Sequence, residues 1–185
     1  MAMTALPFHP RAFLVAVTLS VRASPARRNL AFNPYDRHGD TGIYPHAQAN
    51  VETRGEAVFA AYNAIDGIYE NGSHGEWPYQ SWGINRDPNA EWTLSFGRPV
   101  RIDELRLTLR ADFPHDSWWE SAVVAFSDGS EESLELKKDS HPQMFDIKAR
   151  TVEWLTLRHL KKADDPSPFP ALTQFEAWGT EAAEQ

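Results

Sequence analysis

Short runs in which apolar and polar residues alternate dominate the chain from residue 91 to residue 178. A period of two places every second side chain on one face, which is typical of half-buried strands. Asp128-Gly129 between two such runs favours a β-hairpin. The runs are Glu91–Phe96, Ile102–Leu109, Ala122–Phe126, Ser133–Leu136, Met144–Ile147, Val152–Leu157 and Leu172–Trp178. So many short strands with almost no helix predict an antiparallel β-sandwich of about eight strands, a jelly roll.

The part before these runs is less regular. Glu56–Ile65 is rich in alanine, carries apolar residues at helical spacing and is followed by Gly67, which predicts one short helix. Residues 29–50 predict a long ordered loop, because aromatic residues interrupt their glycine, proline, histidine and asparagine. Residues 66–90 predict a second long irregular segment, which contains Trp77, Tyr79 and Trp82. Long loops on a rigid scaffold are where binding groups are presented.

Length and charge limit the function classes. With 185 residues the chain suits one domain, residues 1–185. A formal net charge of −8 without a basic block argues against nucleic acid as a partner. The chain has no cysteine, which excludes disulfides and thiolate chemistry. Glycine-rich phosphate loops, nucleophile elbows and His-Glu-x-x-His zinc motifs do not occur in the sequence.

The first residues allow two interpretations. Residues 12–21 are apolar, follow Arg11 and precede the small residues 23–26, as in a cleavable secretory signal. However, Phe13, Val15 and Val17 begin a strict alternation, which a strand needs and a signal does not. We therefore favour a strand and a cytoplasmic protein, with secretion as the alternative. The sequence contains no run long enough to span a bilayer.

The segment from Arg110 to Trp119 joins two predicted strands and is unusually rich in binding groups. Asp112, His115, Trp118 and Trp119 follow Arg110 within ten residues. Indole faces stack on the C–H face of a sugar ring, and guanidinium, carboxylate and imidazole groups bind its hydroxyls. This composition predicts a saccharide site. The alternatives are that the two tryptophans close one end of the core, and that Arg110 pairs only with a neighbouring aspartate.

The order of several motifs resembles the discoidin, or coagulation factor 5/8 C-terminal, type of domain. The matching pieces are Ala64-Ile-Asp-Gly67, Trp92-Thr-Leu-Ser-Phe-Gly97, Val100-Arg-Ile-Asp-Glu-Leu105, Phe126-Ser-Asp-Gly129, Ala149-Arg-Thr-Val-Glu-Trp154 and Thr173-Gln-Phe-Glu-Ala-Trp-Gly179. Together they extend over residues 29–180. Among such domains, the chain is most similar to the family-32 carbohydrate-binding modules, which have a galactose-binding-like jelly roll.

This resemblance implies roles for particular residues. Arg110 occupies the position whose arginine hydrogen-bonds ligand hydroxyls, and Trp118 or Trp119 would supply the stacking ring. The predicted ligand-binding residues are Arg110, Asp112, His115, Trp118, Trp119, His74, Trp77 and Trp82.

The resemblance also implies a structural Ca²⁺ site. Its ligands would be Asp66 and Glu176, with side-chain oxygens from Asn71 and Ser73. The alternative is that Asp66 only turns the chain before Gly67 and that Glu176 is a solvated strand residue.

Three functions remain open from the sequence. The first is carbohydrate binding, the second is a small jelly-roll enzyme acting on a saccharide, and the third is a protein-interaction domain. The enzyme would draw acid, base and cation from Asp112, His115, Asp116, His46, Glu52, Arg54, Arg86 and Asp87. Alternatively, several of these residues pair with each other to hold the long loops. Two carboxylates about 5–9.5 Å apart across a cleft would favour hydrolysis.

Overall fold

Antiparallel β-strands build most of the protein. The computed structural model describes residues 26–39, 42–70, 76–111 and 117–182. The predicted strand at residues 12–21 lies outside them. In the described part, the strands are β1 (Arg28–Asn29), β2 (His46–Ala49), β3 (Trp82–Gly83), β4 (Trp92–Leu109), β5 (Trp119–Phe126), β6 (Glu131–Glu135), β7 (Gln143–Lys162) and β8 (Ala171–Glu181). These eight antiparallel strands confirm the predicted all-β sandwich.

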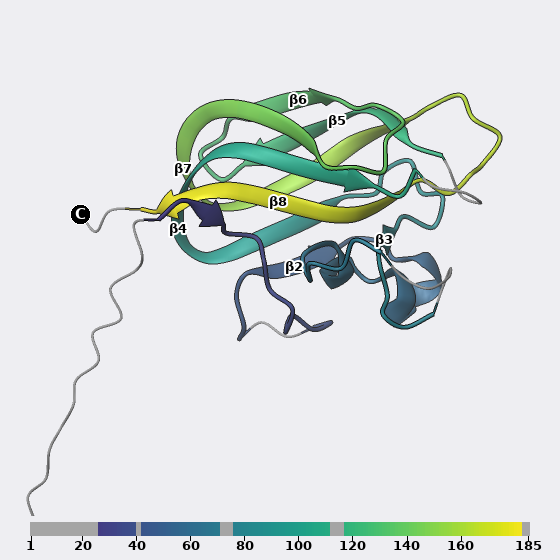
Figure 1. Ribbon diagram of the computed structural model, residues 1–185, viewed down its shortest axis with the longest axis horizontal. Coiled ribbons are helices and arrows are strands. Elements are labelled where there is room, and N and C mark those ends of the chain that lie inside the picture. Colours follow the sequence, from purple (N-terminus) through teal and green to yellow (C-terminus); the bar gives the residue numbers. More distant parts are fainter. Residues whose placement is uncertain (1–25, 40–41, 71–75, 112–116, 183–185) are drawn as a thin grey trace, which may run out of the picture.

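Two long strands, β4 and β7, belong to both layers of the sandwich and curve from one to the other (Figure 1). The first part of β4, Trp92–Ser95, pairs with β2 and with the second half of β7, which in turn pairs with β5. From Val100 onward, β4 pairs with the first half of β7 and with β8. One layer therefore has the order β2-β4-β7-β5-β6. The other has β7-β4-β8, with β1 and β3 along β8.

The continuity of these strands differs from the prediction. Glu91–Phe96 and Ile102–Leu109 were expected as separate strands but are joined within β4, and β7 joins its two predicted runs in the same way. The pairing register shifts between Ser95 and Val100, and such irregularities bend a strand without ending it. Gly97 lies at this bend with φ 68°, and a Cβ there would come within 2.3 Å of the Tyr44 ring.

Large aromatic side chains fill the space between the layers. Trp92 and Phe175 are fully buried, with ring centroids 5.1 Å apart. The Trp92 Nε1 atom donates a hydrogen bond to the Ala61 carbonyl at 3.0 Å. A buried indole whose N–H is hydrogen-bonded removes a large apolar area from water without the cost of burying an unpaired donor. This contact ties the irregular region around Ala61 to the sandwich.

The short helical segment predicted over Glu56–Ile65 is a series of 3₁₀ turns. They are η1 (Thr53–Gly55), η2 (Ala57–Phe59) and η3 (Ala61–Ala64). The backbone is extended at Glu56 and Ala60, with ψ of 144° and 154°, and this separates the turns. The Asn63 side chain then donates to the carbonyls of Ala57 and Ser81. Tertiary hydrogen bonds thus override the alanine-rich helical pattern.

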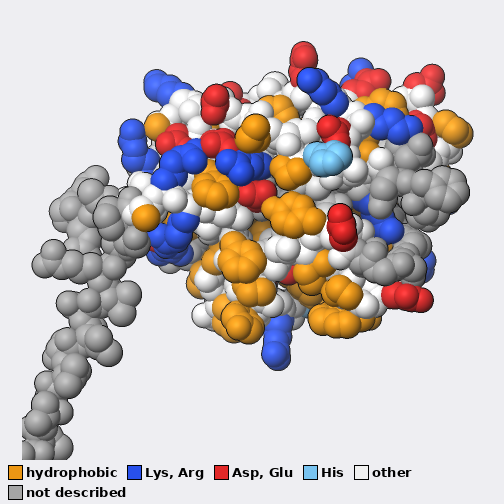
Figure 2. Space-filling model, in the orientation of Figure 1, with side chains coloured by type: hydrophobic (Ala, Val, Ile, Leu, Met, Phe, Trp, Pro, Cys, Tyr) orange, Lys and Arg blue, Asp and Glu red, His pale blue; other side chains and the backbone are white. Residues whose placement is uncertain are grey.

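The loops below the sheets form an aromatic-rich surface. Figure 2 shows hydrophobic side chains gathered on the lower part of the face in view, whereas charged side chains are mixed over the upper part. Phe32, Tyr35 and Tyr44, from the loop between β1 and β2, are among the exposed aromatic residues. None of the helices in the described ranges is long and apolar enough to cross a membrane.

Candidate functional site

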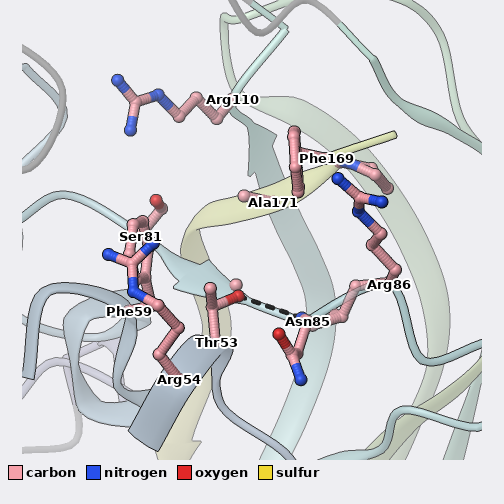
Figure 3. Close-up of a pocket in the computed structure, with 12 residues that line it drawn as sticks. Thr53, Arg54, Phe59, Ser81, Asn85, Arg86, Arg110, Phe169 and Ala171 are labelled. Carbon is pink, nitrogen blue, oxygen red and sulfur yellow. Dashed lines mark hydrogen bonds between the residues drawn. The ribbon is translucent and has the colours of Figure 1, made fainter. Parts of the chain in front are cut away.

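A pocket of about 210 Å³ lies beside the end of β4, where three irregular segments meet the start of β8 (Figure 3). It is lined by Thr53, Arg54, Phe59, Ser81, Gly83, Ile84, Asn85, Arg86, Arg110, Phe169, Pro170 and Ala171. We call it the arginine pocket, because three of these residues are arginines.

Backbone pairing builds the floor of the arginine pocket. Gly83 of β3 pairs with Ala171 of β8, and the Arg110 amide donates to the Ala171 carbonyl at 2.9 Å. The Asn85 amide donates to Thr53 Oγ1 at 2.9 Å, which joins η1 to the chain after β3. A Cβ on Gly83 would lie 2.7 Å from Thr53 Oγ1 and 3.3 Å from Phe59. Glycine at this position therefore lets η1 and η2 approach β3.

The rim carries backbone strain. Arg54, Asn85 and Arg86 have φ of 56°, 50° and 63°, and among the described residues only His159 joins them as a non-glycine with positive φ. This conformation costs an arginine roughly 1–2 kcal/mol, and glycine would adopt it more easily. Residues held in such a conformation cluster at functional sites. Asn85 and Arg86 are the central residues of a turn that is closed by the hydrogen bond from the Asp87 amide to the Ile84 carbonyl at 2.9 Å.

The pocket combines positive charge with aromatic faces. Arg54 donates from Nε and Nη2 to the Glu56 carboxylate, both at 2.7 Å, and this hydrogen bonding raises the pKa of Arg54. The Arg86 guanidinium lies 4.5 Å from the centroid of the Phe169 ring. Figure 3 shows Arg110 and Arg54 on one side of the pocket and Arg86 with Phe169 on the other. Such a site can stack a ring and hydrogen-bond its substituents.

Arg110 directly follows the end of β4 and lines the arginine pocket, and its role in binding a ligand stays a prediction. It is only 6% exposed and borders both the arginine pocket and a second pocket, which Tyr69, Gln80 and His141 also line. It has interactions within the protein besides its backbone hydrogen bond.

The predicted tryptophans do not share one cleft. Trp82 and Trp119 are completely buried, with ring centroids 6.3 Å apart, so neither offers a face to a ligand. They belong to the core because the layers of the sandwich close over them. This corrects the prediction for both and supports the alternative that an indole closes one end of the core.

The remaining predicted ligand residues are dispersed or lie outside the described residues. Trp118 is half-buried, with the Lys138 Nζ atom 5.2 Å from its ring centroid. Trp77 is 77% exposed and packs edge-on against Tyr79. Neither lines the arginine pocket. His74, Asp112, His115 and Asp116 lie outside the described residues, and so do Asn71 and Ser73.

Several residues named for the enzyme hypothesis hold loops instead. His46 Nδ1 lies 2.7 Å from the buried Asp36 carboxylate, which also accepts the Ala47 amide. Glu52 accepts the Ala61 amide at 2.8 Å, and Asp87 accepts the Asn89 amide at 2.8 Å. Among the members of that set that the structure describes, only Arg54 and Arg86 line the arginine pocket. No aspartate or glutamate is among the described residues that line it.

The predicted calcium ligands are bound by hydrogen-bond donors. Glu176 accepts the Tyr69 hydroxyl with one oxygen and Trp178 Nε1 with the other, both at 2.6 Å. Asp66 Oδ1 accepts the Ile68 amide and Gln174 Nε2, both at 2.8 Å. Each carboxylate thus has its own hydrogen-bond partners, and the cation shared by Asp66 and Glu176 stays a prediction.

Burial is the largest cause of the raised pKa values of Asp66 and Tyr69. Desolvation raises the pKa of Asp66 to about 6, although the hydrogen bonds from Ile68 and Gln174 favour its charged form. Desolvation, followed by the hydrogen bond to Glu176, also raises the pKa of Tyr69. No described group of three or more histidine, aspartate or glutamate side chains could hold a metal ion.

The sequence did not single out the two phenylalanines of the pocket. Phe169 lies between two prolines just before β8, and this flanking was the signal that could have indicated a fixed aromatic residue. For Phe59, the apolar spacing within Glu56–Ile65 predicted only a core residue on one face of a helix. Its ring borders the pocket because the 3₁₀ turns bring it beside β3.

Solved structures with a similar fold include carbohydrate-binding modules and lectin domains. Chitosan-binding module 1 of a chitosanase/glucanase from Paenibacillus sp. IK-5 aligns with TM-score 0.56 and 17% identity over 82% of this chain and 99% of that chain. The family 32 module of NanJ from C. perfringens, in complex with galactose, aligns with TM-score 0.54 and 14% identity over 71% of this chain and 91% of that chain. The lectin domain of lectinolysin, complexed with Lewis B antigen, aligns with TM-score 0.58 and 14% identity over 84% of this chain and 98% of that chain.

These similarities confirm the predicted galactose-binding-like β-sandwich. By sequence, no family model and no curated protein matches the chain.

Proposed function

We propose that this protein binds a saccharide in the arginine pocket. The observation that carries the proposal is the placement of Arg110 at the end of β4, fixed by its hydrogen bond to Ala171, in a pocket whose mouth carries the partly exposed ring of Phe169. The fold shared with modules that are named for chitosan, galactose and Lewis B antigen supports it.

The pocket supplies the groups that a sugar ring needs. Phe169 offers a face for the C–H side of the ring, and arginines donate to its hydroxyls. The hydroxyl of Ser81 and the side-chain amide of Asn85 add further polar groups. A volume of about 210 Å³ is below the roughly 300–1,000 Å³ of pockets for drug-sized ligands, so it suits a single ring.

The described lining favours binding over hydrolysis. Glycoside hydrolysis uses two carboxylates beside the scissile bond, and the described residues of the pocket supply none. Arginines and aromatic rings can hold a sugar but cannot act as the acid and base of that reaction at neutral pH.

Calorimetric titration with neutral mono- and oligosaccharides tests the proposal. We expect at least one sugar to bind, and Phe169→Ala to weaken its binding tenfold or more, because the stacking ring is lost. Arg110→Lys should also weaken binding, since a point charge replaces a planar fork.

Tyr35→Ala is the matched control. Tyr35 is an aromatic residue, 76% exposed, on the loop between β1 and β2, and its removal should leave the affinity unchanged. Circular dichroism spectra and melting temperatures establish that each variant is folded. If no sugar binds to the parent protein, or if folded Phe169→Ala binds as tightly as the parent, the proposal is wrong.

A further inference from the structure

We infer that the saccharide of the arginine pocket is acidic, with a uronic acid as its simplest form. This inference rests on the proposed function and adds the chemical class of the ligand. Its basis is the charge of the pocket. Three guanidinium groups border a small pocket on a chain of formal net charge −8, and none of the described lining residues is acidic. Hydroxyl recognition alone does not require three cations.

Arg86 is the side chain best placed for a ligand carboxylate. Its cation lies over the Phe169 ring at 4.5 Å, and within the described ranges it makes no ion pair. A guanidinium stacked on a ring keeps the edge of its fork available, and that edge matches two carboxylate oxygens. Arg86 also keeps a strained φ of 63°. The same ring can then contact the sugar while the guanidinium binds its anionic group.

Arg54, on the opposite side of the pocket from Arg86, can also bind a ligand carboxylate. Its ion pair with Glu56 is exposed on both partners, and exposed pairs of this kind are weak. A ligand carboxylate can therefore share or replace Glu56 at small cost. Arg110 completes the positive lining from the buried side. Guanidinium groups on both sides of the pocket favour an anion wherever its sugar ring lies.

Matched sugars make the sharpest test. D-galacturonate and D-galactose share one ring and differ at C6, where a carboxylate replaces a hydroxymethyl group. Glucuronate and glucose form a second pair. Calorimetric titration should show the acidic member of at least one pair binding tenfold or more tightly than the neutral one. Raising the salt from 20 to 500 mM should reduce this preference, because salt screens accessible charges.

Arg86→Gln should remove most of the preference, so that the ratio of the acidic sugar's affinity to the neutral sugar's affinity falls toward one, because the charged fork that would bind the carboxylate is lost. The matched control is Arg37→Gln, since Arg37 is likewise an exposed arginine but lies on the loop between β1 and β2. It should retain the preference.

The outcomes separate the inference from the proposed function. If neutral sugars bind and their acidic partners bind equally or more weakly, the acidic ligand is excluded and saccharide binding stands. If neither kind binds, both fail. If acetate binds as tightly as galacturonate, the pocket is an anion site and the saccharide is excluded. Tighter binding of galactose 6-sulfate than of galacturonate would overturn the choice of a carboxylate.

Discussion

Tryptophans close together in the sequence lie at very different depths in the protein. Trp77 is 77% exposed, whereas Trp82 and Trp119 are fully buried against each other. Trp118 lies between these extremes, with its ring against the Lys138 side chain. Residue type alone therefore does not separate a tryptophan of the core from one that can meet a ligand.

Truncation of two tryptophans should show this difference in stability. Trp119→Ala should lower the free energy of unfolding by about 3–5 kcal/mol, because it opens a large cavity between the layers. Trp77→Ala should change it by less than about 0.5 kcal/mol, since the ring is mostly in water. Urea titrations followed by circular dichroism measure both values. Equal losses in the two variants would contradict the core position of Trp119.

At the scale of elements, Gln174 of β8 connects the sheet to the segment after η3. Its Nε2 lies 2.8 to 3.2 Å from three oxygens, those of the Asn63 and Ile68 carbonyls and the Asp66 carboxylate. Its Oε1 accepts the Gly67 amide at 3.0 Å. Convergent carbonyl and carboxylate oxygens are what a Ca²⁺ ion requires, but here an uncharged amide takes the central place.

Gln174→Glu should convert this place into a calcium site. The variant places a second carboxylate beside Asp66, so without calcium we expect a lower melting temperature than that of the parent at pH 7.5. Millimolar CaCl₂ should raise the melting temperature of the variant by several degrees, because binding to the folded state stabilises it. The parent should respond neither to CaCl₂ nor to a chelator.

Gln48→Glu, on the exposed part of β2, is the control for added charge. It should show no calcium response. A parent protein that is itself stabilised by calcium would contradict this interpretation of Gln174, and a Gln174→Glu variant that ignores calcium would do the same.

At the scale of the whole molecule, β4 and β7 couple the two layers. Trp92–Ser95 of β4 pairs in one layer and Val100–Leu109 in the other, and β7 pairs with β4 along both stretches. Within the second of these layers, Gly179 lets β8 lie close against β4, because a Cβ there would lie 2.0 Å from the Arg101 carbonyl oxygen. One layer therefore cannot separate without breaking strands that also form the other.

This continuity predicts cooperative unfolding of the sandwich. In urea, far-ultraviolet circular dichroism and tryptophan fluorescence should give one transition with the same midpoint. The first signal follows the strands of both layers, and the second follows the buried indoles between them. Two separated midpoints would show that the layers unfold independently.

Much of the architecture could be predicted from local patterns. Alternating residues indicated the strands, Asp128-Gly129 indicated the hairpin between β5 and β6, and Arg110 was expected at the end of its strand. The helical spacing around Val58 and Tyr62 could not reveal the 3₁₀ turns, since extended backbone at Glu56 and Ala60 depends on tertiary contacts. The sequence predicted strand ends within β4 and β7 where the structure has bends, because a bend and a strand end have the same pattern in the sequence.

The sequence by itself determined the all-β class and the places of the alternating runs that form β4 to β8. A strand with one buried face must alternate, and this requirement is local and visible in the order of residues. Only the tertiary structure decided which side chains meet. Phe169 lies over Arg86, Gln174 binds Asp66, and Trp82 packs on Trp119. Such contacts join segments far apart in the chain, and they depend on strand pairing and layer packing, which no local pattern encodes.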